Sequence, residues 1–244
     1  MILFPDRLIP YALNMQDELL PRMVRHLILN YSSLSSVGLL NGKMGGVLFF
    51  YLYARHTGKS YYINIADSLL DNVYEQLNDN MPVDFCSGLS GVGWGVEYLI
   101  QNKFVDADSD ELLEDIDAKI MEWDVRRIKK WDLHTGLSGI LYYVITRLES
   151  YDRRDRKLPF DPLYLEDLLA AIENYPADVN FTFSKALVSR FQGIMQGNIN
   201  YATPVVIPEV LYDSVDVSQI THLSGIPIGI ENGLTGVALK LILS

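Results

Sequence analysis

The sequence predicts an all-α protein built from tandem helical hairpins, with inner and outer helices arranged as an α/α toroid. Three observations predict this class: a glycine motif that recurs at a nearly constant spacing, an apolar segment after each motif, and an amphipathic segment after that. No alternating strand pattern competes over more than a few residues, and no shift in composition marks a second domain. We therefore expect one domain over residues 1–244.

The glycine motif appears four times along the chain. Each copy has a glycine, two residues, a second glycine and then an apolar run, and the leading glycines are Gly42, Gly88, Gly136 and Gly233. Their spacings are 46, 48 and 97 residues, so the last spacing is about twice the others. A further copy is expected near residue 184, where Phe181–Val188 keeps a helical pattern without either glycine. Repeats of this length indicate stacked supersecondary units.

The two kinds of segment between the motifs predict two layers. The apolar segments are Val47–Ala54, Trp94–Ile100 and Ile140–Ile145. Helices that are apolar on all sides are buried, so these segments should form the inner layer. The segments that follow, at residues 62–77, 112–120 and 165–172, repeat apolar residues at steps of three and four with polar residues on other faces. This pattern is typical of half-exposed helices, which we expect in the outer layer.

The stretch from residue 198 to 229 breaks the pattern, because it is rich in Pro and Gly and has little periodicity. We expect it to be irregular, with a short helix at Glu209–Ser214.

Composition excludes several classes of function. The formal net charge is −11, from 31 acidic and 20 basic residues, which disfavours nucleic acid and anionic membrane surfaces. The single cysteine, the absence of a signal-peptide pattern and the lack of a spanning apolar stretch predict a cytoplasmic protein without membrane insertion.

Side chains that precede each leading glycine should converge at one rim of the central cavity. The glycines themselves are expected to act sterically, by allowing positive φ and a close approach of backbones. Helix starts also carry unpaired N–H groups that favour polar partners. The side chains expected at the rim are Leu40, Asn41, Cys86, Ser87, His134, Thr135, Glu231 and Asn232.

Several of these segments resemble the repeats of the LanC-like family (lanthionine synthetase component C). The resemblance is carried by Gly38–Gly46, Tyr53–Tyr62, Gly88–Ile100 and Glu231–Gly236. It implies an α/α toroid, here with about five hairpins where the family has seven, so the ring should be open or reshaped. Active members of that family use zinc to make a cysteine thiolate on a substrate peptide, which adds to dehydroalanine or dehydrobutyrine and closes a thioether ring.

The resemblance also implies where zinc would bind. The family's ligands lie directly before such glycines, in a Cys-x-Gly motif and a Cys-His-Gly motif. Cys86-Ser87-Gly88 matches the first motif, whereas the second is not present. His134 and Glu231 each lie two residues before a glycine, so Cys86 and His134 are the expected zinc ligands, with Glu231 as a possible third. Because a motif is missing, we expect no cofactor, with zinc as the alternative.

Individual residues leave several interpretations open. His134, Glu231 and Asp84 are the candidate catalytic residues, and Asp84 could pair with Glu231 or Asp132 as acid and base. Glu97 is the only charge in an apolar inner segment; we expect a salt bridge to Arg55, with a cavity-facing carboxylate as the alternative. The candidate binding residues are Asn41, Cys86, Ser87, Thr135, Asn232 and Glu97.

Three functions remain open, and the sequence leaves catalysis undecided. The first is a non-catalytic or altered relative of the thioether-forming cyclases, which binds a peptide or a partner enzyme in peptide maturation. The second is an active zinc-dependent cyclase. The third is an α/α-toroid glycan-processing enzyme that uses paired carboxylates. The missing Cys-His-Gly motif favours the first. The oligomeric state is not indicated by the sequence.

Overall fold

The computed structural model describes residues 9–150, 158–173, 182–198, 206–208, 211–212, 220 and 222–243. These residues form nine α-helices and one 3₁₀ turn, and no strand occurs among them. The elements are α1 (Ile9–Tyr31), α2 (Lys43–Thr57), α3 (Tyr61–Gln76), α4 (Leu89–Gln101), α5 (Ser109–Met121), η1 (Val125–Arg127), α6 (Leu137–Ser150), α7 (Pro162–Glu173), α8 (Thr182–Met195) and α9 (Leu234–Leu243). The all-helical prediction is confirmed over the described residues.

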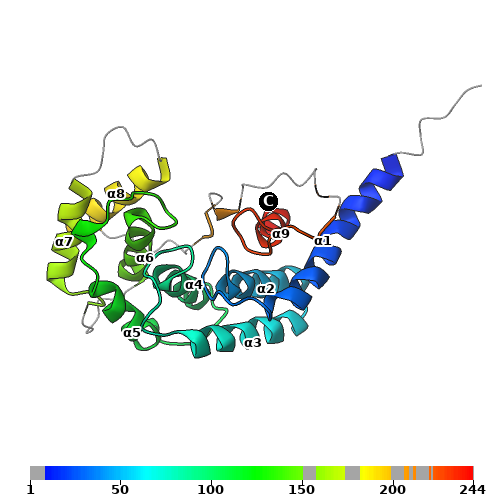
Figure 1. The fold of residues 1–244 in the computed structure, drawn as a ribbon, viewed down its shortest axis with the longest axis horizontal. Helices are drawn as coiled ribbons and strands as arrows, with labels where there is room; N and C mark the ends of the chain where they lie inside the picture. The colour runs from blue at the N-terminus through cyan, green and yellow to red at the C-terminus, as the bar shows by residue number, and fades with distance from the viewer. Residues whose placement is uncertain are drawn as a thin grey trace, which may run out of the picture.

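The helices pack in two layers. In the inner layer α2, α4, α6 and α8 follow one another, and α9 packs against α2 and α1, so that the last repeat lies beside the first (Figure 1). In the outer layer α3 packs on α2, α5 on α4, and α7 on α8 and η1. Burial follows the predicted apolar and amphipathic patterns. Helix α2 is buried continuously from Lys43 to Ala54, whereas α3 buries only Ala66, Leu69 and Val73.

The helix predicted near residue 184 is confirmed as α8. It packs against α6, as the next inner helix should. The hydroxyl oxygens of Ser138, at the start of α6, and Ser184 are hydrogen-bonded at 2.9 Å, and both side chains are buried. The copy without glycines therefore occupies the same layer as the copies that have them.

Close approach is the reason for the second glycine of each motif. A Cβ there would lie 2.0 to 2.5 Å from the carbonyl oxygen of the residue six positions earlier, which is backbone and cannot move aside. The expectation of positive φ is wrong for the leading glycines Gly42 and Gly88, whose φ values are −139° and −113°. Each inner helix thus starts directly on top of its own preceding loop. The four second glycines are Gly45, Gly91, Gly139 and Gly236.

In each of three repeats, a buried hydroxyl group joins the start of the inner helix to the preceding loop, a feature that we did not predict from the sequence. Ser90, Ser138 and Thr235 each donate to the carbonyl oxygen of the residue seven positions earlier. The sequence contains a pattern that could have predicted it, because each of the three hydroxyl residues lies two positions after a leading glycine. The hydroxyl gives a hydrogen bond to a carbonyl group of the preceding loop and so joins the loop to the helix start.

Glu97 has a different partner from the one expected. Its carboxylate is fully buried and accepts from Arg147 Nη1 at 3.2 Å, so the predicted salt bridge to Arg55 is wrong. Arg147 also pairs with Asp117 at 2.8 Å, which joins inner helices α4 and α6 to outer helix α5. Arg55 instead lies over the Phe104 ring, 3.6 Å from its centroid. Arg147 is the only cation of α6, and its place in an otherwise apolar helix could have indicated that it pairs with a buried carboxylate.

Two expectations on chain organisation stay predictions. The irregular stretch from 198 to 229 falls partly outside the described residues, as does most of the short helix expected at Glu209–Ser214. The assignment of residues 1–244 to one domain is likewise untested. Within the described ranges, no helix combines the length and the apolar content that crossing a membrane requires.

The glycine geometry predicts opposite effects for two substitutions. Gly91→Ala should lower the free energy of unfolding by about 1–3 kcal/mol, because its Cβ would meet the Phe85 carbonyl oxygen at 2.0 Å. Gly193→Ala in α8 should raise it by about 0.5–1 kcal/mol, because the nearest atom is 3.9 Å away. Urea denaturation followed by circular dichroism measures both. Equal stability of the two variants would contradict the steric interpretation.

Candidate functional site

Backbone hydrogen bonds connect the loops that precede four inner helices. The Cys86 N–H donates to the His134 carbonyl at 2.9 Å, and the Leu40 N–H donates to the Cys86 carbonyl at 3.0 Å. The Ile230 N–H in turn donates to the Leu40 carbonyl at 2.6 Å. The loops therefore lie side by side in the order of α6, α4, α2 and α9. This contact places the residues before the leading glycines next to one another, as the sequence predicts for the rim.

Four side chains meet at this row of loops, and we call them the rim cluster: Asn41, Cys86, His134 and Glu231. Asn41 Nδ2 donates to Cys86 Sγ and to Glu231 Oε2, both at 3.2 Å. The other carboxylate oxygen of Glu231 lies 3.0 Å from His134 Nε2. Cys86 Sγ is 3.8 Å from Glu231 Oε2. Glu231 thus contacts the other three members.

The rim cluster is open to solvent on one side. Asn41 is exposed, and the side chains of His134 and Glu231 are 43% and 31% exposed. Cys86 is only 8% exposed, so the sulfur lies beneath the polar groups. A ligand that approaches the rim would meet the imidazole, the amide and the carboxylate before the thiol.

The surroundings of Cys86 hold the thiol in its neutral form. Burial raises the pKa of Cys86, because the charged thiolate is poorly solvated there. The carboxylates of Glu231 and Asp84 raise this pKa further, while hydrogen bonds from Ser87 and Asn41 lower it. The thiolate is the nucleophilic form, so this environment disfavours nucleophilic attack by Cys86 at neutral pH.

Asp84 and Asp132 hold equivalent turns in successive repeats. Asp84 Oδ1 accepts from the Ser87 N–H at 2.7 Å, and Asp132 Oδ1 accepts from the Thr135 N–H, also at 2.7 Å. The same bond at the same place in two repeats indicates that these carboxylates shape the loops. Direct contact of Asp84 with Glu231 or Asp132 is not seen among the described side chains, and its catalytic role stays a prediction.

The remaining predicted binding residues surround the cluster or lie away from it. Ser87 and Thr135 are held by the turns just described, and Thr135 is exposed at the surface. Asn232 is exposed and has φ of 50°, in the left-handed region that asparagine tolerates. Glu97 is not part of the cluster, because it is fully buried against Arg147.

The donor atoms of the rim cluster do not fit a zinc ion as they stand. Cys86, His134 and Glu231 offer sulfur, nitrogen and oxygen, but only one thiol is present where the LanC-like motifs supply two. Among the described residues, no group of three or more His, Cys, Asp and Glu side chains is arranged so that it could hold a metal ion. Glu231 instead uses its oxygens on His134 and Asn41.

Comparison with known protein families gives one finding. Residues 34–186 match the family model described as lanthionine synthetase C-like protein. The matched part contains the first three glycine motifs and the start of α8, whereas the last motif, at Gly233, lies beyond it. No curated protein matches the chain.

The carboxylate of Glu231 should control how easily the Cys86 thiol ionises. In Glu231→Gln the nearby negative charge is removed, so the pKa of Cys86 should fall and the thiol should react with iodoacetamide at lower pH. The pH dependence of the alkylation rate measures this shift. Glu111→Gln, at an exposed position on α5, is the matched control and should leave the pH profile of alkylation unchanged. An unchanged profile in Glu231→Gln would show that the carboxylate does not act on the thiol.

Proposed function

Since the chain belongs to the family of lanthionine synthetase C-like proteins, we propose that it is a non-catalytic relative of the thioether-forming cyclases that binds a peptide at its rim cluster. Membership also supports an α/α toroid, with the inner helices from α9 to α8 as an incomplete ring. The single cysteine supports a cytoplasmic location.

One observation carries the proposal: the Glu231 carboxylate lies at the centre of the rim cluster and contacts its other three members. The Glu231 carboxylate holds both the His134 imidazole and the Asn41 amide, and Asn41 in turn holds the only thiol. A zinc cyclase needs a metal with an open position for the substrate thiolate. In this chain a carboxylate takes the central place, and it opposes the formation of any thiolate beside it.

The charges at the rim favour a basic peptide as the ligand. Asp84, Asp132 and Glu231 all lie in the loops that form the rim, and the chain as a whole carries a net charge of −11. A cationic segment would be drawn to this surface. The exposed Asn41 amide and Thr135 hydroxyl offer hydrogen bonds to a peptide backbone.

An active zinc cyclase is the second candidate, because Glu231 contacts both Cys86 and His134 and brings three different donors together. The glycan-processing alternative has less support. It requires a free pair of carboxylates, whereas Asp84 and Asp132 are each engaged in a turn.

Metal content separates the first two candidates. We expect the tag-free protein, after dialysis against a zinc-containing buffer and then against metal-free buffer, to retain much less than one zinc per chain, since the cluster offers one thiol. Inductively coupled plasma mass spectrometry measures the metal, and Cys86→Ser is the matched control. One zinc per chain in the wild type that is lost in Cys86→Ser would overturn the proposal in favour of the cyclase.

Protection of Cys86 tests the binding role directly. A synthetic lysine-rich peptide without cysteine should slow the alkylation of Cys86 by iodoacetamide, because a ligand at the rim covers the thiol. The same peptide with glutamate in place of lysine should give no protection, because the rim repels it. Equal rates with and without the lysine-rich peptide would count against a peptide site at the rim.

A further inference from the structure

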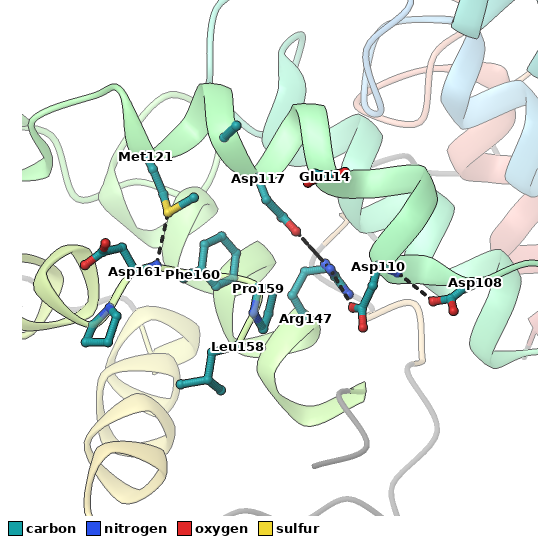
Figure 2. Close-up of a pocket in the computed structure, with 12 residues that line it drawn as sticks. Asp108, Asp110, Glu114, Asp117, Met121, Arg147, Leu158, Pro159, Phe160 and Asp161 are labelled. Atoms are coloured by element: carbon teal, nitrogen blue, oxygen red, sulfur yellow. Dashed lines mark hydrogen bonds and ion pairs between the residues drawn. The ribbon is translucent and has the colours of Figure 1, made fainter. Parts of the chain in front are cut away.

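A second surface, away from the rim cluster, has the properties of a docking site. Two hollows, of about 1030 and 510 Å³, lie between α5 and the start of α7. Figure 2 shows the larger one, with Glu114 and Asp117 of α5 on one side and Leu158 and Phe160 on the other. We call the two hollows together the outer groove.

The hollows adjoin one another, because two residues line both of them. These are Met121, at the end of α5, and Asp161, which precedes α7. The Asp161 N–H donates to Met121 Sδ at 3.2 Å, so the two elements touch at this point (Figure 2). The outer groove therefore continues past this contact from one hollow into the other.

Large apolar side chains are exposed along the outer groove. Trp123 is 50% exposed and Leu163 is 70% exposed, and both line the smaller hollow. Leu158, in the larger hollow, is 39% exposed. Leu163 is exposed although α7 buries Leu165 and Leu168, and Trp123 and Leu158 lie in the segments between helices. Exposed apolar groups that gather beside a hollow mark an interaction surface.

Acidic side chains accompany the apolar ones. Glu114 and Asp161 are exposed in the groove. Among the described residues that line it, the two cations are already engaged: Arg147 is buried in ion pairs with carboxylates, and Arg126 pairs with Asp124. The groove therefore presents negative charge beside an apolar floor, and a ligand that carries both positive and apolar groups matches it.

Glu114 faces the groove because of its place on α5. Glu114, Ala118 and Met121 follow at steps of four and three, which puts them on one face of the helix. The buried apolar residues Leu113 and Ile120 lie on the face that packs into the protein. The groove face of α5 is thus distinct from its core face, and a change at Glu114 leaves the core intact.

We propose that the outer groove binds an extended peptide segment in which lysine or arginine alternates with large apolar residues. Trp123 and Leu163 receive the apolar side chains, and Glu114 and Asp161 receive the cations. A second copy of this chain is disfavoured as the occupant, because both copies carry a net charge of −11. An anionic membrane or a nucleic acid is disfavoured for the same reason.

The proposal does not depend on the function of the rim cluster. The rim cluster is formed by the loops before α2, α4, α6 and α9, whereas the groove is formed by α5, residues 122–126 and the start of α7. Binding of a peptide at one surface does not require binding at the other. Variants at the two surfaces therefore separate the two proposals.

Binding of a defined probe tests the groove. The probe is a fluorescein-labelled peptide of alternating lysine and leucine, followed by fluorescence anisotropy on the full chain. Glu114→Lys should raise the Kd of the probe about tenfold, because it removes a carboxylate that binds lysine. The double variant Trp123→Ala, Leu163→Ala should raise it by a similar factor, because it removes the apolar contacts to leucine. Thermal unfolding checks that each variant is folded.

Matched controls and two further probes decide the outcome. Glu111→Lys, on the same helix, and Leu29→Ala, which is 77% exposed on α1, should leave the Kd within about twofold. Probes with serine for leucine, or glutamate for lysine, should bind far more weakly. Glu114→Lys should leave the protection of Cys86 by the lysine-rich peptide unchanged. An equal loss in Glu111→Lys and Glu114→Lys, or full affinity in the double variant, would overturn the proposal.

Discussion

The row of backbone hydrogen bonds between neighbouring loops is the constraint on which the rest of the rim depends. Cys86 and Leu40 each give their N–H to one neighbour and their carbonyl to another, so the loops are fixed at hydrogen-bond distance. Each inner helix also starts directly over its own loop, where a Cβ on the second glycine would collide with backbone. The glycines act through this packing, and the side chains of the rim cluster come together as its consequence.

Much of the helical architecture could be predicted from the sequence, because periodicity reports burial. The apolar segments became α2, α4 and α6, and the segment near 184 became α8 even without its glycines. Order around the layer was harder to predict: nothing in the spacing says that α9 packs beside α2. The partner of Glu97 was missed for the same reason, since Arg147 lies 50 residues away on the next inner helix. Long-range neighbours depend on tertiary packing, which a local pattern does not record.

The candidate site shows the same division between local and distant information. The glycine motifs in the sequence were enough to predict that Cys86, His134 and Glu231 lie close together at the helix starts. Their connections could not be predicted, because the bridging role of Asn41 depends on which loops are adjacent. The outer groove left no motif at all, since Trp123, Leu163 and Glu114 come from separate elements. It became visible only when exposure and hollows could be compared in three dimensions.

The position of α9 makes the rim depend on a segment distant in sequence from its other loops. Glu231 reaches Asn41 across 190 residues, and no earlier segment supplies the carboxylate at the centre of the cluster. During synthesis, the loops before α2, α4 and α6 can assemble well before this carboxylate leaves the ribosome. A chain that stops short of it can therefore build most of the inner layer and still lack the ligand-facing surface. Recognition at the rim therefore depends on a segment that lies far along the sequence from the loops that it completes.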